Sequence, residues 1–448
     1  MQTIEQLRCG ELLGVTHLKL CCGLSSFPRE ILDLADSLEI LDLSGNALST
    51  LPDDLWRLGK LRLIFCSENK FTELPAVLGA CPELSMVGFK ANRIHKVSAA
   101  ALPTQLRWLI LTDNLLEELP AELGNCSQLQ KLMLAGNRLL ALPPQLANCQ
   151  RLELLRIAAN RLSELPPWLL SMPRLSWLAY SGNPFCAEFE AGAYSKSPIN
   201  DIAWSALALE QVLGEGASGV IHRAQLREAG GAARSVAVKL FKGAVTSDGL
   251  PGSEMAASIA ASAHPSLIPI LGSLADHPSG LNGLVMALIA PDFQNLAGPP
   301  SLASCTRDTY APDTCFSLSA LLQLVGALAS AAQHLHGRGI MHGDLYGHNI
   351  LCCAQGRALI GDFGAASFYA SDGSATAQAI ERLEVRAFAC LLEELLDRCT
   401  ALPEEVPTLG MLAVLKSACL SEVPGDRPLF AAIHLQLMDI ERVINQKA

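Results

Sequence analysis

Hydrophobic positions recur at a fixed spacing over the first 186 residues of this chain. Asparagines stand at steps of 22 or 23 residues, at Asn46, Asn69, Asn92, Asn114, Asn137, Asn160 and Asn183. A leucine lies eight residues before each asparagine, an aliphatic residue five before it, and an apolar residue two after it. Alternating side chains on a short strand place such positions on one buried face. The pattern therefore predicts a solenoid in which each asparagine side chain bonds backbone groups where the chain leaves the strand.

This pattern resembles the leucine-rich repeat. Seven copies are clear, and a degenerate copy at Leu18 to Pro28 lacks its asparagine. The resemblance implies an α/β solenoid, or horseshoe, over residues 1–186.

The strand residues six places before each asparagine are expected to point outward from the concave face. Most of them are apolar: Ile40, Leu63, Met86, Trp108, Leu154 and Trp177. An exposed apolar surface of this extent is typical of a binding site. We expect a protein partner or substrate there; the alternative is that this face packs on another part of the same chain, most plausibly the C-terminal domain.

The periodicity stops after Cys186, and a stretch rich in small residues follows. We expect a linker over residues 187–204 and a second domain over residues 205–448.

Three patterns in the second domain indicate a nucleotide site. A glycine loop between two strands lets backbone amides approach phosphate oxygens. Lys239 lies in the apolar strand that follows, where a lysine needs an anionic partner, and Glu254 is the expected one. Further on, Asp344, Asn349 and Asp362 have the spacing needed to orient a hydroxyl and bind magnesium on ATP. On these patterns the residues expected around the nucleotide are Leu213, Gly214, Gly216, Gly219, Ile221, Ala237, Lys239 and Glu254.

In this order, the motifs resemble the catalytic domain of protein kinases. The resemblance implies a bilobal α+β fold with an N-lobe at 205–286, a hinge at 287–290, an insertion at 291–316 and a C-lobe at 317–448. Met286 and Leu288 then receive the adenine. Lys239 positions ATP, Asn349 and Asp362 bind Mg²⁺ or Mn²⁺, and Asp344 is the catalytic base. The expected activity is an atypical serine/threonine-type protein kinase in a signalling role.

Three departures from the kinase pattern leave alternatives open. Gly343 stands where many kinases carry an arginine, and Tyr346 stands where serine/threonine kinases usually place a lysine against the transferred phosphate. The missing charge is expected to slow phosphoryl transfer unless the Tyr346 phenol, His348 or another cation substitutes for that lysine. The segment after Gly364 is short, with Ala379 to Glu381 as the candidate for its closing motif and Ser367 among its candidate autophosphorylation sites. The alternatives are a nucleotide-binding scaffold, or pseudokinase, and a small-molecule phosphotransferase of the aminoglycoside or choline kinase type.

Composition and charge indicate which other classes of partner and location the chain does not fit. The net charge of −11 does not favour nucleic acid, which calls for a basic face. No run of residues approaches the roughly 20 apolar positions of a membrane span, so we expect a cytoplasmic protein. The 15 cysteines lack metal-type spacing and are expected to be reduced. The His-Gly-Asp catalytic loop suggests a bacterial source.

Overall fold

The chain divides into two structural units in the computed structural model. The structure describes residues 2–196, 199–216, 218–227, 231, 233–243, 245–261 and 263–445, without the side chains of 193–196 and 443–445. Ala217 of the glycine loop lies outside these residues. One unit comprises Met1–Arg174 and Asn183–Phe185, and the other comprises Leu175–Gly182 and Cys186–Ala448. The eighth repeat strand therefore belongs to the second unit.

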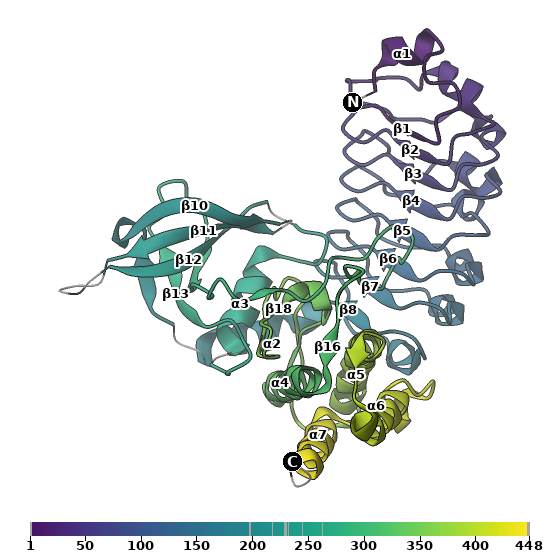
Figure 1. The fold of residues 1–448 in the computed structure, drawn as a ribbon. Helices are drawn as coiled ribbons and strands as arrows, with labels where there is room; N and C mark the ends of the chain where they lie inside the picture. Colours follow the sequence, from purple (N-terminus) through teal and green to yellow (C-terminus); the bar gives the residue numbers. More distant parts are fainter. Residues whose placement is uncertain are drawn as a thin grey trace. The chain divides into compact units, whose positions relative to one another are not determined.

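The first unit is the predicted repeat solenoid (Figure 1). Its short strands pair in parallel with their neighbours in chain order, one strand per repeat. They are β1 (His17–Lys19), β2 (Ile40–Asp42), β3 (Leu63–Phe65), β4 (Met86–Gly88), β5 (Trp108–Ile110), β6 (Lys131–Met133) and β7 (Leu154–Arg156). Helix α1 (Ile4–Arg8) precedes them. A 3₁₀ helix follows each strand's turn: η1 (Arg29–Leu34), η2 (Leu55–Arg57), η3 (Ala76–Ala80), η4 (Ala99–Ala101), η5 (Ala121–Asn125), η6 (Pro144–Asn148) and η7 (Pro167–Ser171).

The asparagines bond the backbone as predicted. Asn137 donates from Nδ2 to the carbonyl oxygens of Leu111 and Leu134, each at 2.9 Å, and its Oδ1 accepts from the Leu116 N–H at 3.0 Å. The side chain thus joins neighbouring repeats and satisfies buried backbone groups that would otherwise be costly.

The expected concave column is also in register, because Ile40 pairs with Leu63 and Met86 with Trp108 along the sheet. Within the column, Leu63, Met86 and Leu154 are buried, whereas Ile40 and Trp108 are half-buried. The Lys131 ammonium lies over the Trp108 ring, 4.2 Å from its centroid.

The N-lobe of the second unit is a six-stranded sheet in the order β10-β11-β12-β14-β13-β9. Its strands are β9 (Asp201–Ala203), β10 (Leu207–Glu215), β11 (Gly219–Leu226), β12 (Arg234–Phe241), β13 (Ile270–Ala275) and β14 (Gly283–Ala287). Helix α3 (Pro251–Ala261) packs with this sheet through Ile259, which joins Phe241 and Leu284 in one apolar cluster.

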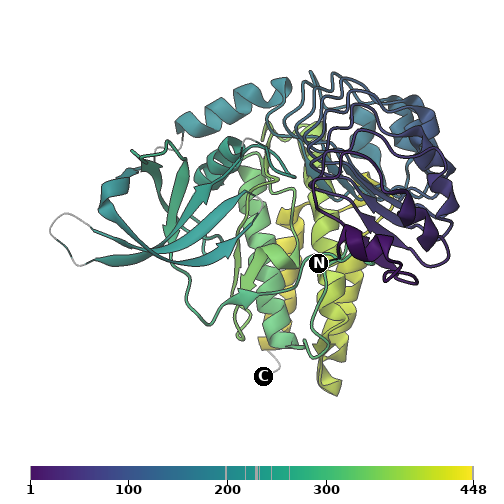
Figure 2. The same ribbon diagram turned by 90° about the horizontal axis from the view of Figure 1, so that it is seen from above.

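The expected linker at 187–204 is wrong in part. Residues 187–196 form helix α2 (Ala187–Lys196), which lies alongside α3 (Figure 2). Strand β9 then pairs in parallel with β13 at the sheet edge, and η9 (Trp204–Ala206) leads into β10. Small residues in this stretch indicated flexibility, but they are also compatible with helix, since alanine is the strongest helix former.

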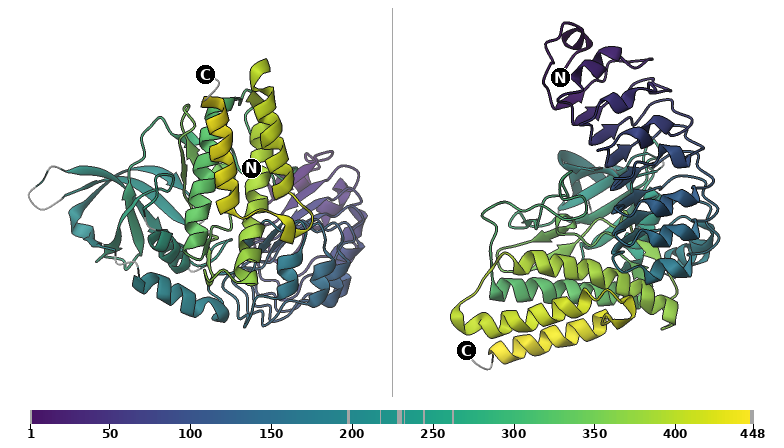
Figure 3. Two further views of the ribbon diagram at one scale, coloured as in Figure 1. Left: turned by 90° about the horizontal axis from the view of Figure 1, so that it is seen from below. Right: turned by 90° about the vertical axis from the view of Figure 1, so that its right-hand side faces the viewer.

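Four helices form the body of the C-lobe (Figure 3). They are α4 (Leu318–Gly337), α5 (Ala375–Leu396), α6 (Val406–Cys419) and α7 (Phe430–Asn445). Two small sheets hold the site loops: β17 (Ile340–Met341) with β20 (Ser367–Phe368), and β15 (Gln294–Asn295) with β18 (Ile350–Cys352) and β19 (Ala358–Ile360). Among the described residues, α4 alone has the length and apolar composition to cross a membrane, and 56% of that window is buried inside the fold.

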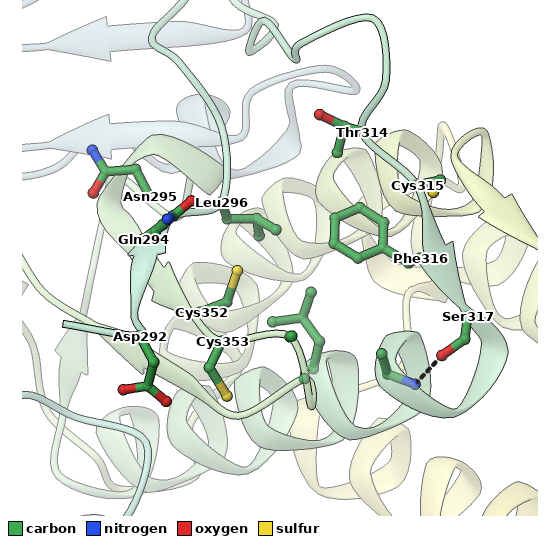
Figure 4. A pocket seen from close by; sticks show the side chains of 14 residues that line it. Asp292, Gln294, Asn295, Leu296, Thr314, Cys315, Phe316, Ser317, Cys352 and Cys353 are labelled. Carbon is green, nitrogen blue, oxygen red and sulfur yellow. Dashed lines mark hydrogen bonds between the residues drawn. The ribbon is translucent and has the colours of Figure 1, made fainter. Parts of the chain in front are cut away.

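The residues 291–316, expected as an insertion, are tied to the C-lobe at several points. Strand β15 pairs with β18, and Arg307 forms ion pairs with Glu393 and Glu394 of α5 at 3.1 and 2.6 Å. At its end, β16 (Phe316–Ser317) pairs with β21 (Cys399–Thr400). The segment also forms one wall of a cavity of about 450 Å³, in which Leu296 and Phe316 lie across from Cys352 and Cys353 (Figure 4).

Candidate active site

A cavity of about 470 Å³ lies under the glycine loop of the second unit. Most of the predicted nucleotide residues line it: Leu213, Gly214, Gly216, Gly219, Ile221, Ala237, Lys239 and Met286. Asp362 lines it as well. The volume lies in the range typical of small-molecule and cofactor sites.

The lining of this cavity differs from the expectation in two ways. Leu288 does not line it; Leu288 borders a neighbouring cavity instead, while Ala287 and Ile289 line this one. Successive side chains of an extended segment point to opposite sides. A residue one position away in the hinge therefore faces away from the cavity. Sequence reasoning also missed Ile268, Asn295 and Leu351, which carry no motif and reach the cavity only through the fold.

The glycines of the loop have two different physical roles. A Cβ on Gly219 would lie 2.4 Å from the Leu240 carbonyl oxygen, so this position is glycine because two strands pass closely. A Cβ on Gly214 or Gly216 would meet nothing within 4 Å. At these two positions the absent side chain leaves open space in which backbone amides can approach a ligand.

Lys239 on β12 forms a buried ion pair with Glu254 on α3, as predicted from the sequence. Its ammonium also lies 3.9 Å from the Asp362 carboxylate, which is half exposed. Burial raises the pKa of Glu254, and the nearby Asp362 acts in the same direction while Lys239 opposes both. The arrangement holds one cation among two acids at the wall of the cavity.

Asp344 and Asn349 contact each other in the loop that follows β17. Asn349 donates from Nδ2 to the Asp344 carboxylate at 2.7 Å and to the Asp344 carbonyl at 3.0 Å. His342, which is buried, contacts the Gly361 carbonyl through Nε2 at 3.0 Å, and its Nδ1 accepts from the Asp344 N–H at 3.3 Å. Since Nδ1 is an acceptor, Nε2 carries the proton and donates. His342 thus ties the loop to the residue before Asp362.

Glu384 on α5 anchors the start of this loop. Its carboxylate accepts from the backbone N–H groups of His342 at 3.1 Å and Gly343 at 2.7 Å, and it contacts His336 Nε2 at 2.8 Å. Burial alone would raise the pKa of Glu384, but the hydrogen bonds from His336 and Gly343 lower it below its ordinary value. The sequence did not indicate this role of Glu384, because its only recognisable feature is its position in an expected helix.

Tyr346 does not point a free phenol toward a phosphate. Its ring stacks on Trp177 of β8 (Trp177–Ala179), with ring centroids 4.3 Å apart and planes 7° from parallel. Both side chains are buried. The expectation that Trp177 belongs to a partner surface is therefore wrong for this residue, and the alternative of packing on the C-terminal domain applies to it.

His348 is held by the segment after the hinge. Its Nδ1 lies 2.7 Å from one Asp308 carboxylate oxygen, and its backbone N–H donates to the other at 3.0 Å. Burial lowers the pKa of His348, but the hydrogen bond to Asp308 and the charges of Asp344 and Asp362 raise it overall. His348 is therefore the group in this loop that favours a positive charge.

The segment after Asp362 differs from the expected activation segment. Helix α5 already begins after Ser374, which caps it, so Ala379 to Glu381 lie inside a helix and form no closing motif. Ser367 is fully buried in β20 and accepts a hydrogen bond from the Tyr180 N–H at 2.9 Å. A hydroxyl in this position is not accessible for phosphorylation in the folded chain.

The donor set fits a magnesium ion of the kinase type. No group of three or more His, Cys, Asp or Glu side chains with metal-ligand geometry occurs among the described residues. Mg²⁺ on a nucleotide needs fewer protein ligands, because waters and phosphate oxygens complete its shell. The half-exposed Asp362 carboxylate at the cavity and the Asn349 amide, oriented by Asp344, are hard oxygen donors of this kind.

Comparisons with known families match both parts of the chain. Residues 207–399 match the family of protein tyrosine and serine/threonine kinases, and residues 37–58 match the leucine-rich repeat family. ATP and a divalent metal are used generally by such kinase domains.

Curated relatives match short stretches. A probable serine/threonine-protein kinase of Arabidopsis thaliana is 28% identical over 24% of this chain and 13% of its own length. Roco9, a probable serine/threonine-protein kinase of Dictyostelium discoideum, is 41% identical over 14% and 2% of the respective lengths. A human PH domain leucine-rich repeat-containing protein phosphatase is 31% identical over 24% of this chain. The chain thus spans a small part of each relative, 6% in the last case. Together with the structure, these matches establish a leucine-rich repeat solenoid followed by a protein-kinase fold.

Proposed function

We propose that this protein is an ATP-dependent protein kinase, with serine or threonine hydroxyls as acceptors. The observation that carries the proposal is the convergence of two sets of groups in one unit. Lys239, which is paired with Glu254, and Asp362 line the nucleotide-sized cavity, while Asp344 and Asn349 are bonded to each other in the preceding loop.

Each group has a defined task in the proposed reaction. Lys239, oriented by Glu254, binds ATP phosphates beneath the glycine loop. The Asp344 carboxylate, held by Asn349, orients the acceptor hydroxyl and accepts its proton as the hydroxyl oxygen bonds to the γ-phosphorus and the bond from that phosphorus to the ADP leaving oxygen breaks. Asn349 and Asp362 would hold magnesium, which when bound would neutralise charge on the phosphates. Such catalysis is mainly positioning and electrostatic stabilisation.

The cation usually supplied by the family's lysine needs a substitute in this loop. Tyr346 is neutral and stacked on Trp177. His348 is the better candidate, since Asp308 lies 2.7 Å from its Nδ1 and favours the charged imidazolium. We propose that His348 takes over part of the charge stabilisation in the transition state.

The repeat solenoid is proposed to bind the protein partner or substrate. The half-buried Ile40 and Trp108, with the Lys131 ammonium over the indole, offer a mixed apolar and cationic contact surface on the strand face. A cytoplasmic site of action is part of the same proposal.

The test replaces the catalytic acid. Asp344→Asn is expected to lower phosphoryl transfer by at least about 10³-fold, because the amide cannot accept the hydroxyl proton. Nucleotide affinity is expected to change less than about threefold, because Lys239 and the cavity stay intact. The measurement is transfer of label from γ-³²P ATP to a generic protein, alongside Mg-ATP binding by calorimetry. Full activity of Asp344→Asn would contradict the proposal.

A second candidate function is transfer to a small-molecule hydroxyl. The early start of α5 at Ala375 favours it, because little chain remains after Asp362 to form a peptide-docking platform. The same assay with an aminoglycoside as acceptor separates the two: label on the aminoglycoside and none on protein would favour this candidate. Nucleotide binding without transfer to any acceptor would favour a scaffold.

A further inference from the structure

We propose that Trp177, a residue of the last repeat by sequence, is a positioning residue for the catalytic loop. The proposal rests on the proposed kinase function. It assigns the segment Leu175–Gly182 to the catalytic apparatus and not to the partner-binding face.

The contact reaches the residues directly beside the catalytic acid. The Trp177 indole covers the Tyr346 ring, and its Nε1–H donates to the Leu345 carbonyl oxygen at 3.3 Å. Leu345 and Tyr346 are the two residues that follow Asp344. A stacked, fully buried aromatic pair with a hydrogen bond at its edge restricts both the side chain and the backbone of that loop.

The same short segment is attached to two further elements of the second unit. The Tyr180 N–H donates to Ser367 Oγ on β20, and Arg386 of α5 donates to Ser176 Oγ at 2.7 Å. The segment Leu175–Gly182 therefore contacts the catalytic loop, the segment after Asp362 and the helix that anchors the loop. One incidental packing contact would not produce three bonds to three functional elements.

Gly343 gives an independent reason to regard the contact as built in. A Cβ at this position would lie 2.6 Å from the carbonyl oxygen of Leu178 and 2.6 Å from that of Ala365. The arginine that many kinases carry here would collide with β8. The two departures from the kinase pattern, Gly343 and Tyr346, are thus explained together: the first makes room for β8, and the second stacks on it.

The consequence for catalysis is a division of tasks in the loop. The residue at the position of the family's lysine braces the backbone, so that Asp344 keeps its bond to Asn349. Because phosphoryl transfer depends on alignment, a loosened loop is expected to lower kcat while nucleotide binding persists.

The experiment uses the full chain with Trp177→Leu, which keeps an apolar side chain but removes the stack and the N–H donor. Hydrogen–deuterium exchange of residues 342–350 is expected to rise about tenfold, on the scale of a lost aromatic pair. In the same variant kcat is expected to fall about tenfold, with the KM for ATP within about twofold of the parent. Trp177→Phe, which retains a ring, is expected to have an exchange rate and a kcat close to those of the parent.

Trp56→Leu is the matched control, since Trp56 lies on η2, is 53% exposed and takes no part in the site. It should change neither quantity. Unchanged exchange of residues 342–350 in Trp177→Leu would overturn the proposal whatever the activity, as would equal kcat in the variant and the parent. Absence of transfer in the parent itself would count against the proposed kinase function, and the exchange measurement would still decide the role of Trp177.

Discussion

At the scale of single residues, Gly343 shows how a fold constrains a catalytic motif. It combines a positive φ of 74° with two backbone oxygens at the position of a side chain. We predict that Gly343→Ala lowers the free energy of unfolding by about 3 kcal/mol or more, since left-handed backbone strain and a steric clash add. Chemical denaturation of the second unit, followed by circular dichroism, measures it.

A substitution at Gly373 measures the cost of backbone strain without the steric clash. It has nearly the same φ, 72°, but a Cβ there would meet nothing within 4 Å. Gly373→Ala is therefore expected to cost about 1 kcal/mol, the value for backbone strain alone. Equal costs at the two glycines would mean that the collision with Leu178 and Ala365 is relieved without penalty, which would contradict the packing described here.

At the scale of elements, Glu384 joins α5 to α4 and to the catalytic loop. Its pKa in the folded chain is lower than in the unfolded chain, so its contribution is present above the ordinary glutamate pKa and lost as pH falls through the lowered value. We predict that the free energy of unfolding of the parent decreases below about pH 4.5 with a slope that Glu384→Gln lacks in part. At pH 7 the substitution is expected to cost about 1–3 kcal/mol, because a buried donor loses its acceptor.

Denaturant titrations of both proteins from pH 3 to 7 measure this difference. Glu404→Gln, at an exposed site, is a suitable control that should follow the parent at every pH. Identical pH profiles for the parent and Glu384→Gln would show that the carboxylate does not anchor the loop electrostatically.

The elements also show which features could be predicted from the sequence. The repeat strands and the contact between Asp344 and Asn349 follow from local spacing, since a strand period or a loop length fixes which side chains meet. Trp177 and Leu345 lie 168 residues apart, and no local pattern indicates that they touch. The same holds for Asp308 and His348, because the segment after the hinge carries no motif that reveals its partner. Helix α2 was missed because small residues favour helix and linker alike.

At the scale of the whole molecule, the boundary between the units lies inside the last repeat and not after it. A kinase domain cut at the sequence boundary, residues 187–448, would lose Trp177 and the bond from Tyr180 to Ser367. An almost fully buried tryptophan contributes about 4 kcal/mol or more through its area alone. We predict that residues 187–448 unfold at a correspondingly lower denaturant midpoint than residues 175–448, because Tyr346 and β20 become exposed.

Chemical unfolding and Mg-ATP binding of the two shortened chains test this prediction directly. Residues 175–448 are expected to unfold in one transition and to bind the nucleotide as the full chain does, since every described contact of β8 with Leu345, Ser367 and Arg386 is retained. If residues 187–448 proved as stable as residues 175–448, the segment Leu175–Gly182 would contribute nothing to the stability of the second unit. A lower stability for the shorter chain alone would mean that the final repeat is needed to complete the fold in which the catalytic loop is held.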